Sequence, residues 1–261
     1  MRRASGSFRA IGATVVVVMA GLAGGARAAA TSFVAVDLNA GGDFGEALAV
    51  NDLGQVVGRG SILAGRQPRA FSWTESGGMV GLGDQTDEAV AVNDDGQVVA
   101  QSDEFDQPPR AFSWTTAGGL VDIGVLGAPP PCPDCSHGGP GTTAHDVNEH
   151  GQIVGGSTTA AGGFHAFVWT RTGGMVDLGT LGGSFSEAAA INDSGQVVGR
   201  SVTAAGESRP FSWTQAGGMI DLGTFGGTFS DAVAVNESGQ VVGSSGTADG
   251  HTHAFSCTQA G

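Results

Sequence analysis

Apolar and polar residues alternate along this chain in short runs that recur at nearly constant intervals. In the segment 49–58, two apolar residues are followed by Asn-Asp-Leu-Gly and then by Gln-Val-Val-Gly. The same pattern returns four times, with spacings of 42, 55, 44 and 44 residues between its asparagines. These asparagines are Asn51, Asn93, Asn148, Asn192 and Asn236. Repetition at this period is typical of proteins built from stacked supersecondary units.

Each repeat unit predicts four short β-strands. The apolar run before the asparagine is the first strand, and Gln-Val-Val-Gly is the second. Asn-Asp-x-Gly between them is the usual chemistry of a tight hairpin, because Asn and Gly tolerate positive φ. The alternating segment 70–74 is the third strand, and the apolar run after Gly77-Gly78 is the fourth. No segment shows a 3.6-residue period with caps, so no helix is expected after residue 28.

The two ends of the repeat region are complementary. A spare fourth strand, residues 33–38, precedes the first unit, and the last unit ends after its third strand, residues 254–258. Pairing these two segments would close a ring and leave no exposed sheet edge. The sequence therefore predicts an all-β fold, a single β-propeller of five four-stranded blades closed by its N-terminal strand. A β-solenoid-like repeat array is the alternative, although it would need polar caps at its ends.

The repeats resemble the bacterial HAF-type extracellular repeat family. The units share His-Ala-Phe-x-Trp, Gly-Gly-Met-x-Asp-Leu-Gly, Leu-Gly-Gly-x-Phe-Ser and Asn-Asp-x-Gly-Gln-Val-Val-Gly. The naming tripeptide occurs at residues 165–167 and 253–255, and the other three units carry Arg in place of His. The resemblance covers nearly all of the chain after residue 28. It implies an extracellular or cell-envelope location and brings no established activity.

The N-terminus reads as a secretory signal peptide over residues 1–28. Arg2, Arg3 and Arg9 form a basic region, a short apolar run follows, and Ala26-Arg27-Ala28 fits a cleavage site. The run is too short and too rich in Gly for a stable membrane span, so none is expected after cleavage. A permanent N-terminal anchor is the alternative, because a signal sequence and a short anchor share hydropathy. Residues 29–261 would then form one domain, secreted, extracellular or periplasmic.

The strongly acidic composition restricts the partners. The chain carries a net charge of −14, and removal of residues 1–28 would leave 7 basic against 25 acidic residues, a net charge of −18. Such a surface repels phosphate backbones, so no nucleic-acid partner is expected. The charge suits solubility, divalent cations or a neutral partner. An extracellular protein or a polysaccharide is therefore the expected partner.

A carboxylate recurs five positions before the asparagine in four of the five units. These residues are Glu46, Glu88, Glu187 and Asp231. If the first strands line a central channel, the carboxylates would lie near one mouth of it, where they could attract Ca²⁺. Paired carboxyl groups in a funnel are also what glycoside hydrolysis needs. A repeated structural role, such as accepting backbone N–H groups, is the simpler interpretation.

The third unit departs from the repeat at two adjacent positions. His145 and Asp146 stand where the next unit has Ala189 and Ala190. Both are candidate ligand-binding residues. Neighbouring strand residues point to opposite faces, so no more than one of the pair is expected to face the channel. A strand merely relaxed by the adjoining insertion is the alternative.

That insertion, at about residues 128–141, is rich in Pro and Cys. Cys132 and Cys135 form a C-x-x-C pair, for which a local disulfide is the simplest expectation in an exported chain. The third cysteine, Cys257, replaces a tryptophan that the other four units keep. Those tryptophans recur in every complete unit, which favours core packing between units over a sugar-binding platform.

No nucleophile stands beside an oriented base in the repeats, so no catalytic residue is assigned and an enzyme is not the favoured class. The pattern favours a non-catalytic, secreted binding module. Two alternatives stay open: a carbohydrate-active hydrolase that uses the funnel carboxylates, and a structural component of the cell envelope or matrix. No cofactor is expected other than Ca²⁺ at the ring of carboxylates.

Overall fold

The protein is built entirely of strands and turns. The computed structural model describes residues 15–16, 35–38, 44–61, 67–102, 108–127 and 141–258. Within these ranges there are strands but no helix, which confirms the all-β prediction. No described helix is therefore long and apolar enough to cross a membrane. The predicted Cys132–Cys135 pair and nearly all of the insertion and the signal peptide lie outside the described residues.

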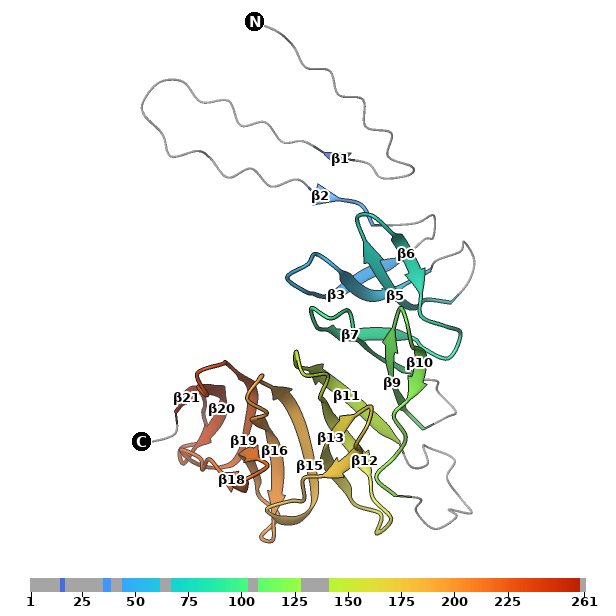
Figure 1. Ribbon diagram of the computed structural model, residues 1–261. Helices are drawn as coiled ribbons and strands as arrows, with labels where there is room; N and C mark the ends of the chain where they lie inside the picture. Colours follow the sequence, from blue (N-terminus) through green and yellow to red (C-terminus); the bar gives the residue numbers. More distant parts are fainter. Residues whose placement is uncertain are drawn as a thin grey trace, which may run out of the picture.

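Five units follow one another along the chain (Figure 1). Their first strands are β3 (Gly45–Val50), β7 (Glu88–Val92), β11 (Thr142–Val147), β15 (Gly182–Ile191) and β19 (Gly226–Val235). Their second strands are β4 (Val56–Gly60), β8 (Val98–Ser102), β12 (Ile153–Thr158), β16 (Val197–Thr203) and β20 (Val241–Thr247). Their third strands are β5 (Arg69–Thr74), β9 (Arg110–Thr115), β13 (Phe164–Thr170), β17 (Ser208–Thr214) and β21 (Thr252–Cys257). The fourth strands of units 1–4 are β6 (Gly78–Gly81), β10 (Gly119–Asp122), β14 (Gly174–Asp177) and β18 (Gly218–Asp221).

Each unit is an antiparallel meander in which successive strands pair. The hairpin between the first and second strands has the predicted chemistry. In unit 1, Asn51 N–H donates to the Gln55 carbonyl, and Gly54 N–H donates to the Asn51 carbonyl. Gly54 has a φ of 77°, in the left-handed region that favours glycine, and the equivalent glycines of the other units do the same. The repeated Asn-x-x-Gly is therefore a turn, as its sequence indicates.

Adjacent units pack face to face through apolar side chains. Val57 of unit 1, for example, is fully buried in a cluster that contains Ala89 and Val98 of unit 2. Trp114, Trp169 and Trp213 pack in the clusters between units 1 and 2, 2 and 3, and 3 and 4. For these three tryptophans the predicted packing role is confirmed. Because each face is buried only by the next unit, stability depends on neighbouring units.

An asparagine ladder, formed by the side chains of the hairpin asparagines, also joins the units. Asn51 Nδ2 donates to the Asn93 carbonyl over 2.9 Å, and Asn93 Nδ2 donates to the Asn148 carbonyl over 3.0 Å. In the same way, Asn148 Nδ2 donates to the Asn192 carbonyl over 3.1 Å, and Asn192 Nδ2 donates to the Asn236 carbonyl over 3.0 Å. A parallel series binds the backbone N–H after each asparagine to an acidic side chain of the next unit, as Glu149 N–H does with Asp193. The Asn-x-x-Gly motif thus forms the hairpin turn within its own unit and also part of the contact with the next unit.

The predicted closing pair is not formed in this structure. β2 (Ala35–Val36) pairs with β1 (Val15–Val16), and β21 pairs only with β20 among the described strands. The units consequently form an open arc (Figure 1). In this structure β2 pairs with residues of the expected signal peptide instead of with unit 5. The outer faces of the end units are uncovered: Val242 is 38% exposed, whereas its counterpart Val198 is fully buried. Short parallel bridges connect units 3, 4 and 5 into one eleven-stranded sheet.

Candidate functional site

A β-bulge interrupts the first strand of every unit. In β11 the register shifts between Ala144 and Asp146, so that His145 is the extra residue. The corresponding bulges in β15 and β19 lie between Ala188 and Ala190 and between Ala232 and Ala234. A bulge turns its side chains away from the regular alternation of a strand. In unit 3 alone, the bulge carries an imidazole rather than an aliphatic side chain.

His145 lines a groove across the first strands of units 3, 4 and 5. The groove has a volume of about 260 Å³. Its polar lining residues are His145, Glu187, Arg200 and Asp231, and its apolar ones are Ala188, Ala189, Ala232 and Val233. The structure therefore brings three of the six predicted site residues together: His145, Glu187 and Asp231. We call this site the inner groove.

Glu187 is the electrostatic centre of the inner groove. Its carboxylate accepts from Arg200 Nη2 over 2.8 Å and lies 3.2 Å from His145 Nε2. The hydrogen bond with His145, and then those with Arg200, hold the pKa of Glu187 below its ordinary value of 4.5, against the opposing effect of burial. The Arg200 guanidinium is positioned from its other side by the Phe185 ring, 5.0 Å away. Glu187 is therefore an ionised hydrogen-bond acceptor at neutral pH.

Asp231 occupies the far side of the inner groove, on unit 5. Its carboxylate accepts a hydrogen bond from Ser244 Oγ over 2.5 Å. Because a carboxylate has about four lone-pair positions, this bond leaves Asp231 able to accept more. The inner groove thus combines N–H donors from one side with carboxylate acceptors on two units.

Glu46 and Glu88 lie apart from the inner groove and share one arginine. Arg59 Nη2 lies 2.8 Å from Glu46, and Arg59 Nη1 lies 3.9 Å from Glu88. Gln101 Nε2 donates to Glu88 over 2.6 Å. Within the described ranges, no three His, Cys, Asp or Glu side chains form a group that could hold a metal ion. The four repeated carboxylates therefore form two groups: Glu46 and Glu88 lie around Arg59, and Glu187 and Asp231 line the inner groove.

Asp146 faces away from the inner groove and joins two units. It accepts hydrogen bonds from the N–H groups of Val147 over 2.9 Å and of Ile191, in unit 4, over 3.0 Å. Burial raises the pKa of Asp146, and these backbone hydrogen bonds oppose the increase. His145 and Asp146 therefore have different partners. Asp146 has the geometry of an inter-unit contact rather than that of a ligand-binding group.

Arg200 lines the inner groove, and Ser244 supports it through its hydrogen bond to Asp231. Neither residue was predicted from the sequence. Glu187 pairs with Arg200 across β15 and β16, and Asp231 pairs with Ser244 across β19 and β20. Residues directly opposite on antiparallel strands interact, so the hairpin register was a signal that could have found them. The carboxylate lies five positions before the asparagine, and its partner lies eight positions after it.

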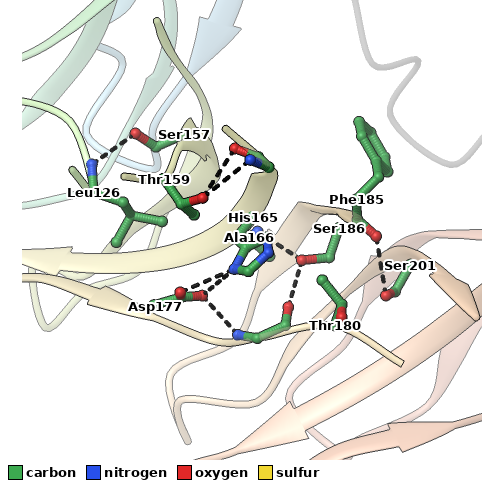
Figure 2. Close-up of polar contacts among 12 residues, drawn as sticks. Leu126, Ser157, Thr159, His165, Ala166, Asp177, Thr180, Phe185, Ser186 and Ser201 are labelled. Atoms are coloured by element: carbon green, nitrogen blue, oxygen red, sulfur yellow. Dashed lines mark hydrogen bonds and ion pairs between the residues drawn. The ribbon is translucent and has the colours of Figure 1, made fainter. Parts of the chain in front are cut away.

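The His-Ala-Phe tripeptide of unit 3 has a structural role (Figure 2). His165 Nδ1 lies 2.9 and 3.0 Å from the two carboxylate oxygens of Asp177. Ala166 N–H donates to Ser186 Oγ of unit 4, and Ser186 Oγ donates to the Gly179 carbonyl. Phe167 is fully buried between units. The tripeptide therefore fixes a junction between units instead of forming an open site.

Comparisons with known proteins give no assignment. No family model matches the chain, and no curated protein matches it. Among solved structures, TolB from Acinetobacter baumannii is similar at 11% identity and a TM-score of 0.45, over 78% of this chain and 52% of its own. A gluconolactonase from Xanthomonas campestris is similar at 15% identity and a TM-score of 0.42, over 85% and 79%. The Aleuria aurantia lectin is similar at 13% identity and a TM-score of 0.35, over 81% and 74%. This chain spans about half the length of TolB.

We expect the stabilising effect of Glu187 to be lost in acid. A carboxyl group whose pKa is lowered by folding stabilises the protein above its unfolded pKa, and this contribution disappears as the pH falls through the folded value. The melting temperature of the wild type should therefore exceed that of Glu187→Gln at neutral pH, and the difference should shrink below the ordinary pKa of 4.5. Thermal melts of both proteins across pH would measure this. A difference that stayed constant down to pH about 3 would contradict the assignment.

Proposed function

We propose that this protein is a non-catalytic binding module whose inner groove takes a small, uncharged, hydroxyl-rich ligand, such as the end of a polysaccharide. One observation carries the proposal: His145, Glu187, Arg200 and Asp231, from three successive units, line one groove. A sugar hydroxyl both donates and accepts hydrogen bonds, so it matches a site with fixed donors and acceptors. Apolar Ala188 and Val233 lie beside them, and the combination is typical of small-molecule sites.

The Glu187–Arg200 ion pair and the net charge of the chain support a neutral ligand. Arg200 neutralises Glu187 within the groove, while the chain as a whole carries a net charge of −14. An anionic ligand would be repelled by this surface on approach, and a simple cation would compete with Arg200 for Glu187. A neutral ligand meets neither obstacle.

Binding is better supported than glycoside hydrolysis. Hydrolysis needs a carboxylic acid that stays protonated until it donates to the leaving group. Hydrogen bonding lowers the pKa of Glu187, the carboxyl group at the centre of the inner groove. The carboxyl groups whose pKa burial raises, Asp146 and Glu149, lie outside the groove and accept backbone N–H groups. The geometry therefore favours holding a ligand over cleaving one.

The place of action in this proposal is outside the cytoplasm, at the cell exterior or in the periplasm. It is supported by the signal-peptide pattern of residues 1–28 and by the resemblance to the HAF-type extracellular repeats. The expected partner is a polysaccharide or an extracellular protein that presents such a ligand.

We further propose that the arc closes into a five-bladed propeller after residues 1–28 are removed. Cleavage there would remove β1, the strand that pairs with β2 in this structure. Val36, Asp37 and Leu38 already line a hollow beside Phe71 on the outer face of unit 1. They would supply a fourth strand to unit 5, for which the described residues contain none.

A thermal-shift experiment with the full chain tests the binding function. Soluble neutral polysaccharides should raise the melting temperature, because a ligand at one hundred times its Kd stabilises the native state by about 2.7 kcal/mol. Glu187→Gln should abolish the increase. Glu46→Gln, the same position in unit 1 and also paired with an arginine, should leave it intact. Parallel samples with Ca²⁺ and with chelator distinguish a cation site from a glycan site. A flat response to every polysaccharide, or an increase kept by Glu187→Gln, would refute the proposed site.

A further inference from the structure

A second hollow lies between units 4 and 5. It has a volume of about 530 Å³, within the range of roughly 300–1,000 Å³ typical of small-molecule sites. Ile220 and Leu222 of unit 4 and Val241 and Cys257 of unit 5 form its apolar lining. Polar side chains surround this apolar part of the lining: Ser194, Gln196, Ser212, Thr214, Asp221 and Thr258. None of its lining residues belongs to the inner groove.

The three earlier junctions show which side chains occupy the space that corresponds to this hollow. At the three other junctions, the later unit inserts a tryptophan from its third strand and a large apolar residue from its fourth. These pairs are Trp114 with Leu120, Trp169 with Met175, and Trp213 with Met219. All three pairs pack in the clusters between units. Unit 5 has Cys257 at the tryptophan position, paired across the hairpin with Val241 as Trp213 is with Val197.

If β2 becomes the fourth strand of unit 5, the residue opposite Cys257 is also small. In unit 4, Phe211 pairs with Asp221 and Trp213 pairs with Met219. The same register would place Asp37 opposite Phe255 and Ala35 opposite Cys257. Both large residues of the pair would then be replaced by small ones. The hollow is therefore present in the open arc and would persist in a closed ring.

We propose that this hollow is a binding site for a small planar aromatic molecule about the size of indole. At the other three junctions the same surfaces accept an indole ring, so their shape and apolar character suit a free one. A hollow that combines apolar walls with a few polar groups is typical of small-molecule sites. Ser212 Oγ, which accepts from Gln196 Nε2 over 2.9 Å, can also accept an N–H from the ligand.

The test uses indole as the probe and the melting temperature of the full chain as the readout. Indole should raise the melting temperature of the wild type and of Cys257→Ser, which removes the thiol but keeps the space. Cys257→Trp should raise the melting temperature by itself, by about 2–4 °C as a cavity-filling change, and should no longer respond to indole. If Cys257→Trp does not fold, Cys257→Leu provides a smaller filling side chain for the same comparison.

Trp213→Cys supplies the control, because it opens a hollow at the same position between units 3 and 4, with Met219 still in place. Its melting temperature should fall, and indole should partly restore it. No response of the wild type to indole, or an undiminished response of Cys257→Trp, would overturn the proposal. An equal response to a saturated bicyclic alcohol would overturn the aromatic class of the ligand.

Discussion

Replacing Asn148 with alanine is expected to lower the free energy of unfolding of the full chain by about 3 kcal/mol. Asn148 is only 4% exposed and sits in the middle of the asparagine ladder. Its side chain accepts from Gln152 N–H over 3.0 Å and donates to the Asn192 carbonyl over 3.1 Å. Alanine would leave the Gln152 N–H without its acceptor in a part-buried site, and a buried unsatisfied group costs about 1–3 kcal/mol. It would also remove a bond between two units.

Asn236→Ala provides the matched control for this experiment. Asn236 makes the same hydrogen bonds within its own unit, to Gln240 N–H over 2.8 Å and to Gln240 Oε1 over 3.3 Å. In the described part of the chain no unit packs on its other side, and its side chain is exposed, so water can replace the lost bonds. The expected loss is about 1 kcal/mol or less. Urea denaturation at a common m-value would measure both losses. Equal losses in the full chain would contradict a stabilising role for the hydrogen bonds between units.

The asparagine ladder could not be predicted from the sequence, although the strands and turns that carry it could. The strands and turns could be predicted, because period-2 alternation and Asn-x-x-Gly are local signals. The hairpin already explained the asparagine, so nothing in one unit revealed that its Nδ2 donates to the next unit. A contact between residues 42 to 55 positions apart depends on how the units stack, and stacking follows from packing of whole faces.

The candidate site was predictable in part for a similar reason. The repeated carboxylates and the anomalous His145 were identified from the sequence, but an equal ring of four carboxylates was expected. The residue opposite each carboxylate differs between units: Arg59, Gln101, Arg200 and Ser244. Only unit 4 combines an opposing arginine with an imidazole from the preceding unit. The single inner groove therefore arises from differences between repeats, whereas the prediction followed what they share.

Removing residues 1–28 is expected to slow amide hydrogen exchange in β21 by about a hundredfold, which corresponds to a rise of roughly 3 kcal/mol in the free energy of local opening. In the full chain, one edge of β21 has no partner among the described strands, while the equivalent β17 pairs on that side with β18. Closure by residues 33–38 would give β21 the same partner. Hydrogen exchange followed by mass spectrometry would compare the two strands before and after cleavage, with β17 as the internal reference.

The contacts left open at the two ends of the arc are the reason to expect closure. Unit 5 presents Val242, 38% exposed, and the Nδ2 donor of Asn236, while unit 1 presents Val50, 64% exposed, and the carbonyl acceptor of Asn51. Four junctions in this structure join such groups already. If closure occurs, Asn236→Ala in the cleaved protein should lose nearly as much stability as Asn148→Ala. Unchanged exchange in β21 together with a small loss for Asn236→Ala would contradict closure, and the arc would then be the native form.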